Sequence, residues 1–128
     1  MNWVEILGWQ EEQLNEIRFS GFSFLREGKY EKARLFFEAL LILDPKCIFD
    51  RQTLGAIYLQ VGENEKALYQ LEKALSMDPS HQPTLMNKAK ALLMLGKKQE
   101  ALDIIQILKK SDDAKLANDA TALLMAHA

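Results

Sequence analysis

The chain has 128 residues, of which 48% are hydrophobic and 27% charged, and its formal net charge is -2. A chain of this length can bury a sizeable core in one domain without disulfides or metals, and the small negative charge argues against binding to a nucleic-acid backbone. Its single cysteine, Cys47, excludes an internal disulfide and suits a reducing compartment.

The N-terminal segment reads NWVEILGW over residues 2–9. A glutamate interrupts its short apolar run and no basic region precedes it, so it is predicted to be neither a secretory signal nor a membrane span. Two interpretations stay open for it. It forms a short helix that covers the helices behind it, or Trp3 and Trp9 form a partner or dimer contact, because two exposed tryptophans are costly on a monomer.

The rest of the chain is predicted to be all-α, with no alternating strand pattern and no low-complexity linker. Gly28, Gly62 and Gly96 fall where a helix must end, since glycine takes the left-handed conformation without penalty. Proline disfavours a helical predecessor, so Asp44-Pro45 and Asp78-Pro79 end further helices. The predicted helices are 10–27, 30–43, 47–61, 64–77, 81–95, 98–110 and 113–126.

These helices repeat in pairs with a period of 34 residues. Small residues recur where the two helices of a pair are expected to cross, because a larger side chain would push the axes apart. The matching sets are Gly21, Gly55 and Ala89; Phe24, Tyr58 and Leu92; Gly28, Gly62 and Gly96; Ala33, Ala67 and Ala101; Phe37, Leu71 and Ile105; and Leu40, Ala74 and Leu108.

This pattern resembles the tetratricopeptide repeat. The resemblance implies a solenoid of three helical hairpins, with repeats at about 14–47, 48–81 and 82–113, a C-terminal cap at 114–128 and a short N-terminal segment, all in one domain over 1–128. The third repeat departs from the pattern at Ala89, which replaces a glycine, and at Asp113, which stands where proline is usual. The cap helix carries Leu116, Ala120 and Leu123 on one side.

The residues that could carry chemistry have structural interpretations. His81 lies in a turn between repeats and His127 near the C-terminus, and neither has a carboxylate or cysteine at a spacing that makes a metal site or a triad. Cys47 is expected to be a small buried residue at a helix start. We therefore predict neither enzyme activity nor a cofactor or metal.

Function is instead expected in the groove of the solenoid. Stacked hairpins curve, and the first helix of each pair lines the concave side. The apolar side chains predicted there suit the apolar face of an amphipathic helix or an extended apolar segment, and methionines make such a surface adaptable. The candidate groove residues are Arg18, Phe19, Phe22, Leu25, Phe49, Gln52, Ala56, Leu59, Met86, Asn87, Lys90, Leu93 and Met94, flanked by Arg26, Thr53 and Gln60.

This groove departs from one well-marked type of tetratricopeptide binder. Chaperone-tail binders hold two carboxylates with a clamp of lysines, asparagines and an arginine. Only Arg18 keeps a positive charge among the matching positions, and the central asparagine is replaced by Thr53. An acidic C-terminus is therefore a poor ligand. The other matching positions are Phe22, Pro83 and Asn87.

A more specific resemblance covers about residues 14–110. Residues 30–45 are similar to the first repeat of bacterial type III secretion chaperones, in which a tyrosine-initiated helix runs into Phe-x-Ala-Leu-x-x-Leu-Asp. Here that pattern is held by Phe37, Ala39, Leu40, Leu43 and Asp44. An ordinary repeat has its alanine one place later, at Leu40.

The resemblance implies a virulence-associated chaperone of the bacterial cytoplasm that keeps a secreted needle or translocator subunit soluble and unpolymerised before export. Translocator chaperones carry an N-terminal extension for dimerisation, whereas needle-subunit chaperones are shorter and work with a small co-chaperone. The length of the chain favours the needle branch. The partners implied are the secreted subunit and, at the N-terminal region, a co-chaperone or a second copy. The alternative is a tetratricopeptide scaffold that assembles proteins without releasing a client.

Overall fold

The computed structural model describes residues 2–8 and 11–127, and these residues form eight α-helices. Six of them make three consecutive hairpins, as the 34-residue period predicts. The helices are α1 (Trp3–Leu7), α2 (Glu11–Arg26), α3 (Tyr30–Leu43), α4 (Ile48–Gln60), α5 (Asn64–Met77), α6 (Gln82–Met94), α7 (Lys98–Leu108) and α8 (Ala114–His127).

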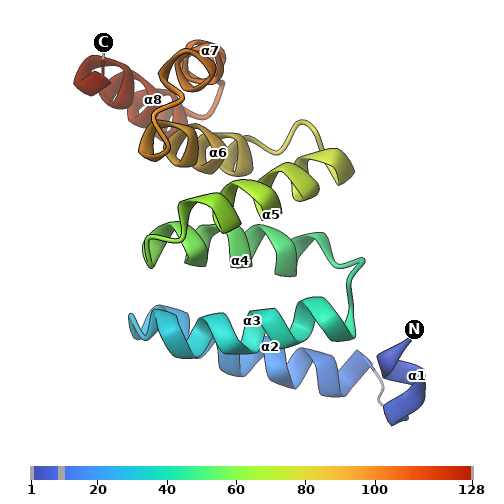
Figure 1. Cartoon of the computed structure of the whole chain (residues 1–128). Helices are drawn as coiled ribbons and strands as arrows, with labels where there is room; N and C mark the ends of the chain where they lie inside the picture. The colour runs from blue at the N-terminus through green and yellow to red at the C-terminus, as the bar shows by residue number, and fades with distance from the viewer. Residues whose placement is uncertain (1, 9–10, 128) are drawn as a thin grey trace.

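The hairpins stack in chain order, so that the molecule is a short solenoid (Figure 1). Within a hairpin α2 packs on α3, α4 on α5 and α6 on α7, and between hairpins α3 packs on α4 and α5 on α6. The two ends are covered by α1, which packs on α3, and by α8, which packs on α7 and α6. Each hairpin thus buries its apolar face against its neighbours. None of the helices in the described residues is long and apolar enough to cross a membrane.

The small residues lie where the helices of a hairpin cross, as the sequence predicts. A Cβ added at Gly55 would lie 2.7 Å from Leu71 Cδ2, and one added at Gly21 would lie 2.9 Å from Phe37 Cε2. From the second helices, Ala33 and Ala67 are fully buried. The helix axes can therefore approach closely because glycine has no side chain at these crossings.

The turns also follow the sequence. Gly28, Gly62 and Gly96 have φ values of +77°, +83° and +78°, so each ends the first helix of its hairpin in the left-handed conformation. At the end of the second helix, the N–H of Asp44 donates to the carbonyl of Leu40, and the N–H of Asp78 donates to that of Ala74.

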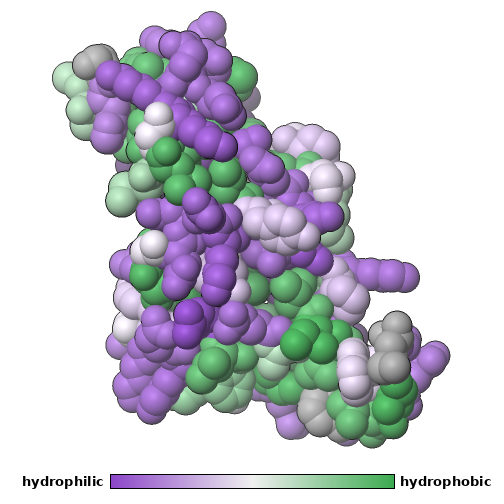
Figure 2. Space-filling model, viewed as in Figure 1, coloured by the Kyte–Doolittle hydropathy of each residue, from purple (hydrophilic) through white to green (hydrophobic). Residues whose placement is uncertain are grey.

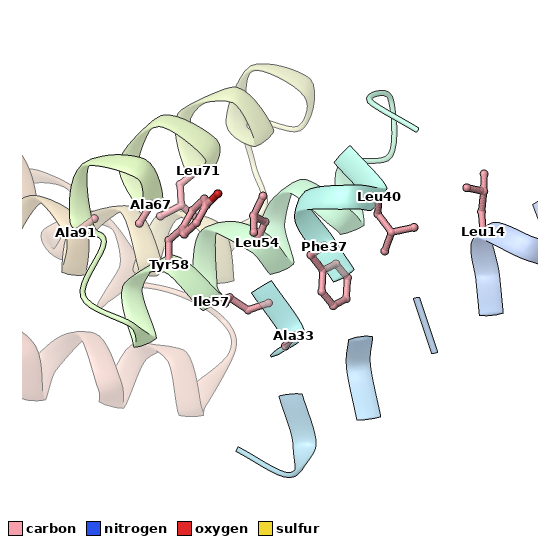
Figure 3. Close-up of a cluster of buried hydrophobic side chains, with 10 residues drawn as sticks. All are labelled: Leu14, Ala33, Phe37, Leu40, Leu54, Ile57, Tyr58, Ala67, Leu71 and Ala91. Atoms are coloured by element: carbon pink, nitrogen blue, oxygen red, sulfur yellow. The ribbon is translucent and has the colours of Figure 1, made fainter. Parts of the chain in front are cut away.

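The buried side chains form two clusters along the stack. The larger spans the first two hairpins and includes Phe37, Leu54 and Leu71 (Figure 3). The smaller spans the third hairpin and α8, and it includes Met86, Ile105 and Ala120. Because Ala120 of α8 is buried in the second cluster, α8 acts as a cap, as predicted.

The third hairpin differs slightly from expectation at its exit. Helix α7 ends at Leu108, whereas the predicted helix runs to residue 110. The N–H of Ser111 donates to the carbonyl of Leu108, so the chain turns there. Asp113, in the usual place of proline, accepts a hydrogen bond from the N–H of Leu116 at 3.2 Å. This contact satisfies one of the free N–H groups at the start of α8, so Asp113 begins the cap helix.

The N-terminal segment contains the predicted short helix, but this helix covers the first hairpin only in part. Trp3 of α1 is 40% exposed, Ile6 is 58% exposed and Leu7 is 48% exposed. Figure 2 shows hydrophobic surface at the lower right, where α1 lies in Figure 1. Trp9 lies outside the described residues. A packed helix and an exposed apolar face are therefore both present at α1.

Candidate partner-binding groove

The structure contains a cavity of about 420 Å³ between three helices, α4, α6 and α8. Most of its lining was predicted for the groove: Ala56, Leu59 and Gln60 from α4, and Asn87, Lys90, Leu93 and Met94 from α6. Apolar side chains make most of the wall, and polar groups add to it. Such a mixture is typical of a site that holds an apolar group in a fixed orientation. We call this feature the α4–α6–α8 pocket.

The other exposed candidates belong to the first half of the stack. Phe19 and Phe22 of α2 are 69% and 41% exposed, and Phe49 of α4 is 44% exposed. The Arg26 guanidinium lies over the Phe22 ring, 5.3 Å from its centre. Exposure of large aromatic side chains to water is unfavourable, so these rings are candidates for contact with a partner.

Three further candidates have mainly internal contacts. Leu25 is half-buried and packs against the first core cluster. Gln52 and Thr53 are also half-buried, and the Thr53 hydroxyl donates to the carbonyl of Phe49 at 2.7 Å. These residues support the exposed ones more than they extend the apolar surface.

The structure corrects the prediction for Arg18, because its guanidinium forms hydrogen bonds inside the stack. Its Nε donates to Asp50 Oδ1 at 2.8 Å, and its Nη2 donates to Asp44 Oδ2 at 2.7 Å. Asp50 is fully buried. The hydrogen bond and the charge of Asp50 and the hydrogen bond of Asp44 raise the pKa of Arg18, against the opposing effect of burial. Arg18 therefore ties α2 to the start of α4, and its guanidinium is not free to bind a partner's carboxylate.

Met86 is a second correction. It is 4% exposed and belongs to the core cluster between the third hairpin and α8. It therefore lies behind the groove surface, whereas Met94, two turns further along α6, is 68% exposed. The periodicity of α6 places both methionines on one side, but α8 covers only the first.

Two residues of the pocket were not predicted for it. Leu123 and His127 of α8 complete its wall. The sequence identifies Leu123 as part of the apolar face of the cap, but it does not show that this face extends past α6 toward α4. The 34-residue register could not find it, because α8 lies outside the repeats.

His81 and Cys47 have structural surroundings at the starts of α6 and α4. His81 Nδ1 accepts from the N–H of Thr84 and so caps α6, which confirms its structural interpretation. Cys47 is half-buried at the start of α4, and burial raises the pKa of its thiol. Cys47 forms a close group with Asp44 and Asp50. The Arg18 guanidinium pairs with both of these carboxylates.

Comparison with known proteins agrees with this architecture. A family model described as tetratricopeptide repeat matches residues 58–124. The chain belongs to the tetratricopeptide repeat family. The fold, in three stacked hairpins with a capping helix, is the one that the 34-residue period predicts.

Solved structures of similar size match nearly the whole chain. The type III secretion translocator chaperone SycD of Yersinia enterocolitica superimposes with a TM-score of 0.81 at 21% identity, over 98% of both chains. PcrH of Pseudomonas aeruginosa, in complex with the chaperone-binding region of PopD, superimposes with a TM-score of 0.80 at 27% identity, over 93% of both chains. The length of the chain, which favours the needle branch, therefore does not separate this tetratricopeptide protein from translocator chaperones.

A curated relative matches in sequence. The mitochondrial import receptor subunit TOM70 of Saccharomyces cerevisiae is 30% identical over 105 residues, which is 82% of this chain. The matched part is only 16% of that protein, so the chain spans a small fraction of its length. This similarity agrees with the repeat fold, and the relative is a much longer protein.

Proposed function

We propose that this tetratricopeptide protein is a cytoplasmic chaperone of a bacterial type III secretion system. It holds an apolar part of a secreted translocator subunit in its concave groove, and it keeps that subunit soluble and unpolymerised before export. The observation that carries the proposal is the apolar α4–α6–α8 pocket in a chain that superimposes on translocator chaperones over nearly its whole length.

The exposed side chains support a polypeptide ligand. Phe19, Phe22, Phe49 and Met94 are each more than two-fifths exposed, and all lie on the first helices of their hairpins. An apolar segment that covered these side chains would remove their surface from water, which stabilises the complex by about 25 cal/mol for each Å² buried. In a solenoid the first helices of successive hairpins lie on one side, so one bound segment can contact several of them.

The solved relatives support the choice of client. PcrH is described in complex with the chaperone-binding region of PopD, at 27% identity to this chain. We infer the same class of client here, a secreted translocator. This choice replaces the needle subunit favoured by length.

The mechanism needs only reversible binding. Segments of the client that would otherwise aggregate are covered while they lie in the groove. Because no covalent step is involved, release requires a competing surface at the secretion machinery, and no cofactor takes part.

Co-expression tests this function. The chain is produced together with a candidate translocator from the same genome, and the soluble fraction of the translocator is measured. A chaperone raises this fraction strongly, whereas a scaffold without a client leaves it unchanged. Phe22→Glu and Leu59→Glu should abolish the effect, while Leu35→Glu on α3, at a side chain 62% exposed, is the matched control and should preserve it.

The exposed face of α1 supports a second, separate contact. We propose that Trp3, Ile6 and Leu7 pack against a second copy of the chain, because a partly covered helix with an apolar outer face suits a self-complementary interface. The substitution Ile6→Glu should lower the mass measured by light scattering, with Glu5→Gln as the control. An unchanged mass would leave α1 as a cap only, and a co-chaperone would appear as a hetero-complex.

A further inference from the structure

We infer that the α4–α6–α8 pocket selects a client segment in which an acidic residue neighbours the apolar residue that enters the pocket. Lys90 forms an ion pair with this acidic side chain. The inference rests on the proposed chaperone function and adds to it a rule of specificity. It names the chemistry that the groove recognises in addition to apolar surface.

The first observation is the charge of the pocket lining. Its polar residues are Gln60, Asn87, Lys90 and His127, and its other residues are apolar. The lining therefore carries a cation and hydrogen-bond donors, but none of the nine lining residues has a carboxylate. A partner with an acidic group would complement this field, and one with a basic group would be repelled.

The second observation is that Lys90 has no partner of its own. Within residues 2–8 and 11–127, no ion pair or hydrogen bond joins its ammonium group to another side chain. Its neighbour Lys88 behaves differently, since its Nζ lies 3.9 Å from Glu72 Oε1. One lysine of α6 is thus used inside the fold, and the exposed one at the pocket is available to a ligand.

The third observation is the contrast with Arg18. Arg18 occupies a groove position in the first repeat, but Asp44 and Asp50 already neutralise it. Arg26, the next cation of α2, lies over the Phe22 ring. Recognition of an acid is therefore concentrated at the third repeat, beside an apolar cavity where partial desolvation strengthens an ion pair.

The geometry favours an internal acidic residue of the client as the source of the carboxylate. Phe49 is exposed on α4, and it lies seven residues, or about two turns, before Ala56 of the pocket on the same face of that helix. A segment bound in the pocket can therefore extend along α4 toward Phe49. Apolar anchoring and the acid are then neighbouring features of one extended segment. The apolar side chain supplies most of the affinity and the acid sets the register.

Selection from a random peptide library tests the inference. Peptides displayed on phage, free of any client sequence, are selected on the full chain and on Lys90→Glu, with Lys98→Glu as the control. Lys98 is exposed at the start of α7 and lies outside the pocket, so this control makes the same change in net charge. The wild type and Lys98→Glu should enrich Asp or Glu next to a bulky apolar residue, and Lys90→Glu should enrich Lys or Arg at that place.

The strongest peptide then gives the size of the effect by fluorescence anisotropy. Replacing its acid with the corresponding amide should weaken binding to the wild type by up to about fivefold, which is the range for a solvent-accessible ion pair. The same replacement should leave binding to Lys90→Glu unchanged or improved.

Two results would overturn the inference, and they differ in what they mean for the chaperone. Apolar peptides enriched without an acid preference, or with the same preference on Lys90→Glu, would refute the role of Lys90 and leave the proposed function intact. If no peptide were enriched on any variant, both the inference and the peptide-holding groove would be wrong.

Discussion

At the scale of single residues, Arg18 shows how a cation predicted to bind a partner is instead used inside the fold. Arg18 lies on the first helix of the first hairpin, but its guanidinium joins α2 to Asp44 and to Asp50 at the start of α4. The partners lie 26 and 32 residues away in the chain. A repeat pattern compares equivalent positions and does not reveal such a pairing.

Arg18→Met should destabilise the fold, because it leaves the fully buried Asp50 carboxylate without its ion pair. We expect a loss of about 3–5 kcal/mol in the free energy of unfolding, as for removal of one partner of a buried pair. Urea unfolding followed by circular dichroism measures it, and the double variant Arg18→Met with Asp50→Asn should recover part of the loss. A loss below about 1 kcal/mol would show that the pair behaves like an exposed one.

Tyr58 should make the stability depend on pH in the alkaline range. It is 5% exposed, and burial together with its hydrogen bond to Glu38 raises the pKa of its phenol. The folded state therefore keeps the proton where the unfolded chain begins to lose it, above a pKa of about 10. This contribution is fully present below that pH and is lost as pH rises through the folded-state pKa.

The comparison of wild type with Tyr58→Phe checks this dependence. Urea midpoints measured at increasing alkaline pH should fall more steeply for the wild type than for the variant. Parallel curves would mean that Tyr58 ionises equally easily in both states.

At the scale of elements, the size of the side chain at each helix crossing limits how closely the two helices of a hairpin can pack. At Gly55 a Cβ would lie 2.7 Å from Leu71 Cδ2 and 2.8 Å from Leu71 Cγ, and Leu71 is fully buried. An added methyl group would therefore force the Leu71 side chain to shift within the core.

Gly55→Ala should therefore lower the thermal midpoint in spite of the better helix propensity of alanine. Overpacking costs about 1–3 kcal/mol, and the gain in propensity returns at most about 1 kcal/mol. Because the clash is with Leu71, Leu71→Ala should be less damaging in the Gly55→Ala background than in the wild type. A variant more stable than the wild type would show that the hairpin opens without cost at this crossing.

The helices were predictable because residues close to each end in the sequence determine where the helix stops. Gly28, Gly62 and Gly96 end the first helices of the hairpins within a residue or two of the predicted positions. Much of the candidate groove was predictable for the same reason, since Leu59, Asn87 and Leu93 hold equivalent faces of repeating helices. The burial of Met86 and the contribution of Leu123 were not, because both depend on how α8 packs against α6.

At the scale of the whole molecule, the cap is also part of the candidate site. Helix α8 closes the apolar end of the third hairpin, and its later residues reach the pocket that α4 and α6 form. Stability of the end and the shape of the groove are therefore coupled. A change in α8 can alter both.

Leu123→Glu should reduce both the thermal midpoint and the affinity for the client. Leu123 is half-buried, packs against the second core cluster and lines the pocket, so a charge there loses apolar contacts in two places. Full burial of a leucine side chain contributes about 1.5–3 kcal/mol to stability, and a charge at this half-buried position adds a cost of desolvation. Met125→Glu on the same helix, at a side chain 76% exposed, should change neither quantity. Unchanged affinity in Leu123→Glu would leave α8 with a capping role alone.

Methyl NMR of labelled methionines shows directly whether a client segment lies in the groove. Met94 lines the pocket, whereas Met77 and Met125 are 41% and 76% exposed and lie outside it. When the translocator segment is added, the Met94 methyl signal should shift while those of Met77 and Met125 stay in place. A shift of Met77 or Met125 with Met94 unchanged would contradict it, because the client would then bind outside the pocket.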